Sequence, residues 1–203
     1  GTDYDFIIIG GGSAGSVLAA RLSEDADVSV LLLEAGGANT SVLVRMPLGA
    51  GQLIKAKSDY NWGFWSEPEP HMNNRRLWHP RGRGLGGSSA INGMIYIRGH
   101  ARDYDQWRQM GLQGWSYADV LPYFKRAENF QDGGNAYHGG DGPLSVSWGE
   151  RSDHPLYVAA IKAGAEAGYK TTPDFNGQDQ EGFGRYQLTI RDGERWSAAR
   201  AYL

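Results

Sequence analysis

The sequence predicts an α/β fold, and three observations carry this prediction. Residues 5–9 (DFIII) and residues 28–33 (VSVLLL) are short apolar runs, and between them residues 14–22 repeat apolar side chains every three or four positions. Short continuous apolar runs are typical of parallel strands buried on both faces, and the 3.6-residue spacing is typical of a helix. Together the three segments predict one βαβ unit of about 30 residues at the start of the chain.

Length, composition and charge limit the class of protein. The chain has 203 residues, 20 Lys and Arg against 23 Asp and Glu, a formal net charge of −3, and no cysteine. The length allows a sizeable core. A nucleic-acid binder would carry a basic surplus, and the lack of cysteine excludes disulfides and cysteine-ligated metals. No apolar run approaches the roughly 18 residues of a membrane-spanning helix. We therefore expect no nucleic-acid partner and no transmembrane segment.

A cluster of glycines follows the first predicted strand directly. Gly10, Gly12 and Gly15 fit the pattern Gly-x-Gly-x-x-Gly. In such a turn the first glycine permits a tight bend, the second lets a pyrophosphate approach the backbone, and the third lets the helix pack on the strand. The amides near Ser13 and Ala14 would lie at the positive end of the helix dipole. The pattern therefore predicts a dinucleotide site.

An acidic residue, Glu34, ends the second predicted strand and is followed by Ala35. A carboxylate at this place is expected to accept hydrogen bonds from the adenosine ribose hydroxyls, and its charge disfavours the 2′-phosphate of NADP. NAD and FAD are both compatible with this first motif.

The remainder of the chain has less regular patterning. Residues 35–83 show no sustained periodicity, and loops of that length are usually functional. Ser116 and Asp119 form a capping-box pattern that predicts a helix to about Ala127. We expect the other segments to be a helix capped by Asp153 and ending near Gly168, strands at 143–147 and 186–190, a turn at 191–194, and a helix or extended segment at 197–203.

A second glycine cluster distinguishes the two cofactors. Residues 80–94 have the sequence PRGRGLGGSSAINGM, in which a glycine pair and two serines precede Asn92. This arrangement resembles the glucose-methanol-choline (GMC) oxidoreductase family, flavoenzymes that oxidise alcohols. Blocks that look like the same family, nearest to its bacterial choline and alcohol dehydrogenase branch, lie at 33–37, 62–68, 96–107, 114–124, 138–144 and 197–203.

The resemblance implies FAD bound without a covalent link. In some family members the residue before the Asn is a His joined to the flavin, and here it is Ile91. The second cluster would meet the FAD diphosphate from the side opposite the first turn, and the segment after Ile91 would pass the isoalloxazine ring. Trp62 either stacks near the flavin or only packs the long loop of residues 35–83. Arg81 either faces a phosphate of the cofactor or covers apolar surface. The residues expected to bind FAD through these later segments are Trp62, Arg81, Gly86, Gly87, Ser88, Asn92, Gly93, Met94 and Ile95.

The resemblance also implies the reaction, which is oxidation of a small-molecule alcohol to the aldehyde by hydride transfer to flavin N5. In the family the histidine that acts as base comes from near the C-terminus, so we assign no catalytic residue here.

We expect no metal site and a structural or surface role for each of the five histidines, which are His71, His79, His100, His138 and His154. An FAD-containing lyase or light-driven decarboxylase and a catalytically silent FAD-binding fragment are the alternatives. An NAD dehydrogenase would have no use for residues 86–94.

The domain organisation follows from the same resemblance and from the strand count. A doubly wound sheet needs at least a third strand. Because residues 35–203 contain no further buried apolar run, we expect these 203 residues to be the N-terminal portion of a longer chain. Residues 1–150 are expected to form a Rossmann-like FAD-binding domain with long insertions, completed by residues beyond this chain. Residues 151–203 would begin an α+β substrate-binding region and return toward the FAD domain. The expected partner is the rest of the polypeptide or a companion chain, and the expected location is the cytoplasm, with peripheral attachment to the inner membrane as an additional expectation.

Overall fold

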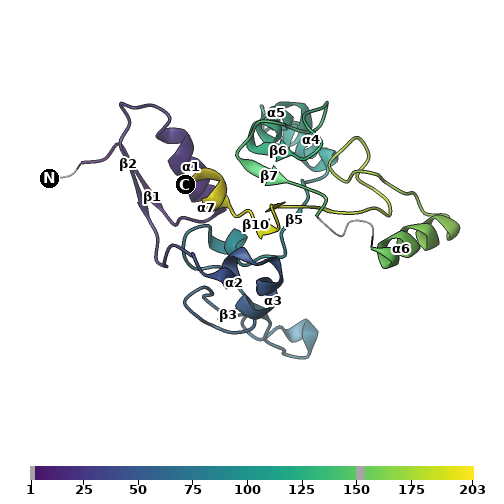
Figure 1. Cartoon of the computed structure of the whole chain (residues 1–203), viewed down its shortest axis with the longest axis horizontal. Coiled ribbons are helices and arrows are strands. Elements are labelled where there is room, and N and C mark those ends of the chain that lie inside the picture. The colour runs from purple at the N-terminus through teal and green to yellow at the C-terminus, as the bar shows by residue number, and fades with distance from the viewer. Residues whose placement is uncertain (1–2, 150–153) are drawn as a thin grey trace. The chain divides into compact units, whose positions relative to one another are not determined.

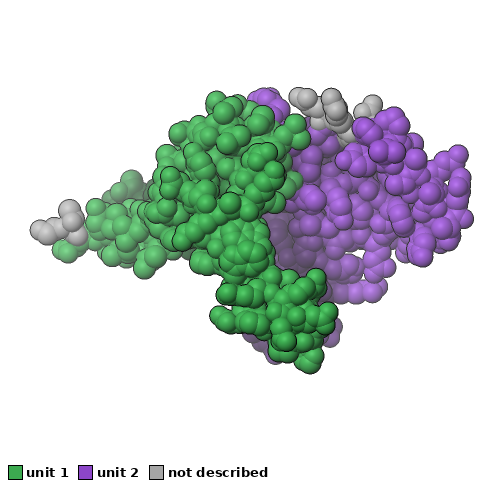
Figure 2. All heavy atoms as spheres, turned by 90° about the horizontal axis from the view of Figure 1, so that it is seen from below, with its two compact units in different colours: residues 1–94, 194–203 green, residues 95–193 purple. Residues whose placement is uncertain are grey.

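A computed structural model describes residues 3–149 and 154–203 (Figure 1). The chain divides into two compact units, coloured green and purple in Figure 2. Unit 1 contains residues 1–94 and 194–203, and unit 2 contains residues 95–193. The division after Met94 differs from the boundary expected at residue 150, because residues 95–149 pair with the segment after 154 through short strands. The roles expected for residues 1–150 and 151–203 stay predictions.

Unit 1 begins with the predicted βαβ unit. Strand β1 (Phe6–Ile9) pairs in parallel with β2 (Val30–Leu33), and helix α1 (Ser13–Leu22) connects them. Helix α1 packs on both strands and on α7 (Ala198–Tyr202), which begins at the N-cap Ser197. The α/β start is therefore confirmed, but burial of the strands on both faces is wrong for the described residues. Ile9 is 86% exposed because β1 and β2 form a two-stranded sheet here.

Residues 35–83 contain short elements instead of a structureless loop. The buried side chain of Asn61 organises them, since its amide group donates to the carbonyls of Leu53 and Ala56 at 3.1 and 3.2 Å. Its Oδ1 accepts the backbone N–H groups of Gly63 and Arg81, both at 3.0 Å. The elements of this part of unit 1 and of its later residues are α2 (Val42–Arg45), η1 (Pro47–Gly49), α3 (Ala50–Leu53), β3 (Phe64–Trp65), η2 (Pro70–Met72), β4 (Trp78–His79), η3 (Gly87–Ala90) and β10 (Glu194–Arg195).

Unit 2 contains the predicted capped helix and strands. Helix α5 (Tyr117–Ala127) starts at Ser116, whose side chain accepts the Asp119 N–H while the Asp119 carboxylate accepts the Ser116 N–H, so the capping box is confirmed. The helix expected after Asp153 is α6 (Pro155–Glu166), and the structure caps it with His154; Asp153 itself lies outside the described residues. The other elements are β5 (Ile95–Tyr96), α4 (Ala101–Gln109), β6 (Glu128–Phe130), β7 (Leu144–Val146), β8 (Gln187–Leu188) and β9 (Ile190–Arg191).

The expected turn after β9 is present, with Asp192 and Gly193 both at positive φ (51° and 73°). None of the helices in residues 3–149 and 154–203 combines the length and the apolar character that crossing a bilayer requires.

A chain of buried charges forms the polar centre of unit 2. Arg98 contacts Glu128 at 2.8 Å, and the imidazole of His138 contacts Glu128 at 2.9 Å on one side and Asp174 at 2.7 Å on the other. Burial alone would favour neutral imidazole, but the hydrogen bonds to Asp174 and Glu128 outweigh it and raise the pKa of His138 to about 9. His138 is therefore a structural cation in this unit.

Candidate nucleotide-binding site

The two glycine clusters meet backbone to backbone inside unit 1. Gly86 donates its N–H to the carbonyl oxygen of Gly11 at 2.7 Å. A Cβ built on Gly87, which has a φ of +51°, would come within 2.7 Å of the Gly12 Cα atom. A side chain at Gly87 would therefore push the two turns apart.

The first turn has the geometry expected of its glycines. Gly10 has a φ of +98° and donates its N–H to the carbonyl of Leu33 at 2.7 Å, which ties the turn to the end of β2. A Cβ on Gly15 would come within 1.9 Å of the Gly10 carbonyl oxygen. The tight bend and the close approach of helix to strand are thus both present.

Glu34 joins the two clusters through hydrogen bonds to backbone amides. Its Oε2 accepts the N–H of Gly11 at 2.7 Å, and its Oε1 accepts the N–H groups of Gly36 and Gly84, each at 2.9 Å. Burial disfavours the carboxylate, but the bonds from Gly36, Gly11 and Gly84 outweigh it and hold the pKa of Glu34 below its ordinary value. The structure thus gives Glu34 an organising role that the sequence analysis missed, and its contact with ribose stays a prediction.

A cavity of about 860 Å³ opens where the two clusters and the strand ends come together. This volume is in the range of small-molecule and cofactor sites. The predicted residues that line it are Gly10, Gly12, Ser13, Glu34, Ala35, Trp62, Arg81, Gly87 and Ser88. The other lining residues, which are not among the predicted site residues, are Ile9, Leu33, Phe64 and Gly82. Ile9 and Leu33 end the two parallel strands, and the rule that ligands bind beyond the carboxyl ends of such strands could have identified them.

Several predicted residues shape the site without lining the cavity. Ala14 and Gly15 belong to the first turn of α1, and Gly86 makes the bond to the first cluster. Asn92, Gly93 and Met94 follow η3 but do not line the cavity, and Ile95 is the first residue of β5 in unit 2. Their position beside an isoalloxazine ring stays a prediction.

The segment that contains Asn92 is held by a buried arginine. Arg195 is 1% exposed, and its Nη1 donates to the backbone carbonyl and the Oδ1 of Asn92 at 2.6 and 2.8 Å and to the Ser89 carbonyl at 3.3 Å. Its Nε donates to the Val44 carbonyl at 2.9 Å. Burial lowers the pKa of Arg195 to about 10. The sequence analysis missed Arg195, because its partners lie 103 to 151 residues earlier in the chain.

The aromatic wall of the cavity is built from Trp62 and Phe64, whose rings stack with centroids 6.1 Å apart. The guanidinium of Arg83 lies over the Trp62 ring at 5.1 Å and donates to the Ala35 carbonyl at 3.1 Å. Arg81 lines the cavity while its Nη1 donates to the Pro80 carbonyl. Trp62 therefore both packs the long insertion and faces the cavity.

The histidines of the described residues lie outside this cavity lining. His100 and His154 cap helices α4 and α6, and His138 belongs to the buried charge chain of unit 2. His71 lies in η2 and His79 in β4. Across residues 3–149 and 154–203 there is no group of three or more His, Cys, Asp or Glu side chains placed to hold a metal ion.

The walls of the cavity fit a dinucleotide. Its floor is made of backbone at the start of a helix and at two glycine turns, where amides and the helix dipole favour a diphosphate. A Cβ on Gly82 would come within 2.0 Å of the Gly87 carbonyl oxygen, so this part of the floor also depends on glycine.

Known proteins match nearly all of this chain. Residues 4–203 match the family model described as GMC oxidoreductase. An oxygen-dependent choline dehydrogenase of Rhizobium etli (strain CIAT 652) is 55% identical over 199 residues, and one of Brucella anthropi is 54% identical over 201 residues. These alignments cover 98% and 99% of this chain but 36% of each relative. The chain therefore spans 36% of the length of these curated relatives.

Solved structures show the same architecture. Pyridoxine 4-oxidase from Mesorbium loti matches 98% of this chain and 39% of its own with a TM-score of 0.92 and 38% identity. An FAD-dependent oxidoreductase from Chaetomium thermophilum matches 99% of this chain and 36% of its own, with a TM-score of 0.88 and 30% identity. A formate oxidase variant from Aspergillus oryzae RIB40 matches 99% of this chain and 37% of its own, with a TM-score of 0.87 and 29% identity.

Proposed function

The chain belongs to the GMC oxidoreductase family of FAD-dependent enzymes, and on that premise we propose that it forms the FAD-binding portion of a longer alcohol oxidoreductase. The observation that carries this proposal is the contact between the two glycine clusters at the mouth of one cavity. A nicotinamide site would need only the first cluster, whereas FAD makes use of both.

The residues around the contact suit the diphosphate of FAD. Gly12 and Ser13 stand at the start of α1, where unpaired amides and the helix dipole favour an anion. Gly87 and Ser88 line the same cavity from the second cluster. We assign the diphosphate to these four residues, and the adenosine ribose to the neighbourhood of Glu34 and Ala35.

The FAD is held without a covalent bond in this proposal. Ile91 occupies the position where some relatives of the family carry a flavin-linked His, and its side chain is 3% exposed in a cluster with Val44, Leu53 and Ala90. An aliphatic side chain packed into that core offers no atom that could form a link to the flavin.

The reaction proposed for the whole protein is oxidation of an alcohol to an aldehyde. Bound FAD supplies the hydride acceptor, while this chain binds the cofactor and fixes its orientation. Because the Rhizobium and Brucella relatives are choline dehydrogenases, a choline-type alcohol is the proposed substrate. The base that takes the hydroxyl proton is proposed to lie on a histidine outside these 203 residues. None of the relatives reported above is a lyase or a decarboxylase.

Further parts of the proposal rest on the resemblance. Residues 1–150 are assigned to FAD binding and residues 151–203 to the start of a substrate-binding region, and the cytoplasm is the proposed location. The rest of the polypeptide, or a companion chain, would complete the site.

The test uses the full-length protein that carries this sequence. The purified protein should be yellow, release FAD on heat denaturation, and show bleaching of its flavin absorption when choline is added without oxygen. A preparation that binds no flavin would overturn the cofactor assignment, and flavin that no primary alcohol reduces would overturn the proposed reaction.

A further inference from the structure

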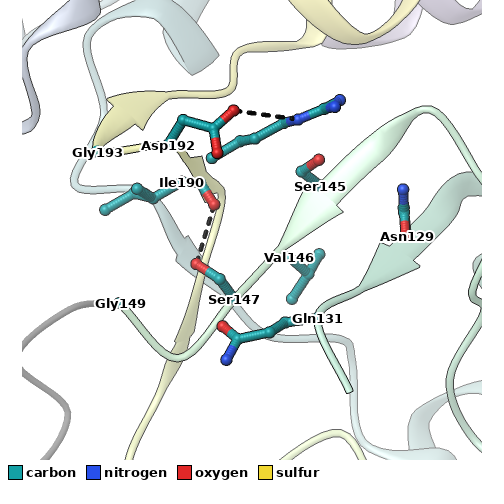
Figure 3. A pocket seen from close by; sticks show the side chains of 10 residues that line it. Asn129, Gln131, Ser145, Val146, Ser147, Gly149, Ile190, Asp192 and Gly193 are labelled. Carbon is teal, nitrogen blue, oxygen red and sulfur yellow. Dashed lines mark hydrogen bonds and ion pairs between the residues drawn. The ribbon is translucent and has the colours of Figure 1, made fainter. Parts of the chain in front are cut away.

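Unit 2 contains a pocket of about 390 Å³ over one face of the β6–β7 strand pair (Figure 3). Its size is within the range of about 300–1,000 Å³ of small-molecule sites and far exceeds the space of one water molecule. All of the residues that line it belong to unit 2, so the pocket is formed by one compact part of the chain.

Strand alternation gives the pocket a polar floor. Strands β6 and β7 are parallel, with Asn129 opposite Ser145 and Phe130 opposite Val146. Because successive side chains point to opposite faces, Asn129 and Ser145 share a face with Gln131 and Ser147. The other face carries Glu128, which is committed to the buried charge chain with Arg98 and His138.

Two side chains on this floor have hydrogen-bonding groups that no described residue uses. Ser145 is 8% exposed, yet its hydroxyl makes no hydrogen bond within residues 3–149 and 154–203. The carboxamide of Asn129, which is half-buried, also makes no hydrogen bond to these residues. Buried polar groups are nearly always paired, so an unpaired one that faces a pocket points to a ligand. Ser147 provides the contrast, since its hydroxyl donates to the Ile190 carbonyl at 2.9 Å (Figure 3).

The charges at the rim leave the pocket without a net preference for an ion. Arg191 and Asp192 lie 3.6 Å apart and offset each other. None of the lining residues is aromatic, so the ring faces that recognise quaternary ammonium groups are absent from this lining. The floor therefore favours a neutral polar molecule.

We propose that this pocket binds a small neutral polyol. A serine hydroxyl and an asparagine carboxamide each donate and accept hydrogen bonds, and a hydroxyl group of a polyol also does both. Adjacent hydroxyls would pair with Ser145 and Asn129, and the amide nitrogen of Gln131 would supply a further donor, since its Oε1 already accepts the Trp148 N–H at 3.2 Å.

The experiment is a titration of sorbitol against the full-length protein, followed by saturation-transfer NMR of the sorbitol protons. The wild-type protein should give a saturable signal. Ser145→Ala and Asn129→Ala should each weaken the apparent affinity by about fivefold to tenfold, as expected for the loss of one hydrogen bond. Because the Ser145 hydroxyl bonds to none of the described residues of unit 2, the Ser145 variant should unfold within about 2 °C of the wild type.

Thr172→Val is the control, because Thr172 lies in unit 2 but outside the pocket lining. It should lower the unfolding temperature, because the Thr172 hydroxyl donates to the Asp174 and Asp179 carbonyls at 3.1 and 2.8 Å, while sorbitol affinity stays within about twofold of the wild type. The proposal is overturned if the wild type gives no saturable signal, if both the Ser145 and Asn129 variants bind as the wild type does, or if the Thr172 variant loses as much affinity as they do. The readout does not involve flavin, so it is independent of the function proposed above.

Discussion

The N–H of Gly86 donates to the carbonyl oxygen of Gly11 at 2.7 Å, and this bond ties together two glycine clusters that are distant in the sequence. Both clusters also donate amides to the carboxylate of Glu34. The cavity wall is therefore a backbone structure whose shape depends on the absence of side chains at a few positions.

Gly87→Ala should impair FAD binding most directly. Its Cβ would approach the Gly12 Cα to 2.7 Å, so one of the turns must shift. We expect the FAD dissociation constant of the full-length protein to rise more than about tenfold, which fluorescence titration of the apoprotein would measure. Gly37→Ala is the control, because a Cβ there meets nothing within 4 Å, and its affinity should match the wild type. Equal affinities for all three proteins would show that this contact does not shape the site.

Glu34→Gln should destabilise the protein in a pH-dependent way. The carboxamide cannot accept all three amides of Gly11, Gly36 and Gly84, and the expected loss is about 1–3 kcal/mol in the free energy of unfolding at pH 7. Because the folded pKa of Glu34 is lowered, its contribution is present above the unfolded value of 4.5 and is lost as the pH falls through the folded value.

Urea unfolding at several pH values measures this difference. The gap between the stabilities of wild type and variant should shrink as the pH falls below the unfolded value of 4.5. Glu166→Gln, at an exposed position paired with Lys162, should change the stability by less than about 0.5 kcal/mol. A gap that is constant down to pH 3 would contradict the role assigned to Glu34.

Arg195→Met should loosen the segment around Asn92. The substitution removes four hydrogen bonds and leaves the Asn92 carbonyl and side chain without their donor. We expect a loss of about 2–4 kcal/mol and faster hydrogen exchange at the Met94 amide, which donates to Asn92 Oδ1 at 3.0 Å. Arg21→Met, which breaks an exposed ion pair with Glu24, should leave that amide unchanged. Unaltered exchange at Met94 in the Arg195 variant would show that the segment holds its shape without the guanidinium.

His138→Asn should remove a stabilising cation from unit 2. The pKa of His138 is raised from 6.5 to about 9 in the folded protein. Its contribution is therefore fully present below about pH 6.5 and is lost as the pH rises through about 9. Chemical unfolding between pH 6 and pH 10 should show a wild-type stability that falls by up to about 3 kcal/mol, and a flatter profile for the variant. Parallel profiles would argue that Glu128 and Asp174 do not hold a protonated imidazole.

Local patterns were sufficient to predict the elements with strong periodicity or a cap. The βαβ unit and the capping box of Ser116 and Asp119 are examples, because each depends on residues a few positions apart. Helices α2 and α3 were not predicted, since each has only four residues and follows no repeat of apolar positions. The exposure of Ile9 also differs from the prediction, because burial depends on strand neighbours and not on the strand itself.

The candidate site was predictable at positions where the local backbone geometry requires one residue type, such as glycine in a tight turn. Gly10 and Gly15 belong to such a pattern, whereas Arg195 and Asn61 act through bonds to distant carbonyl groups. No periodicity marks a residue whose partners are backbone atoms elsewhere in the chain. The role of Glu34 as a bridge between backbone amides was not predicted for the same reason, since Gly84 lies 50 residues further along the chain.

The central claim is that both glycine clusters hold one FAD diphosphate. A crystal structure of the full-length protein with its cofactor measures this directly, through the distances from the diphosphate oxygens to the backbone nitrogens of residues 12–13 and 87–88. We predict at least one hydrogen bond of about 2.7–3.2 Å from each cluster. A diphosphate bound by the first cluster alone, with residues 84–95 turned away from it, would contradict the claim.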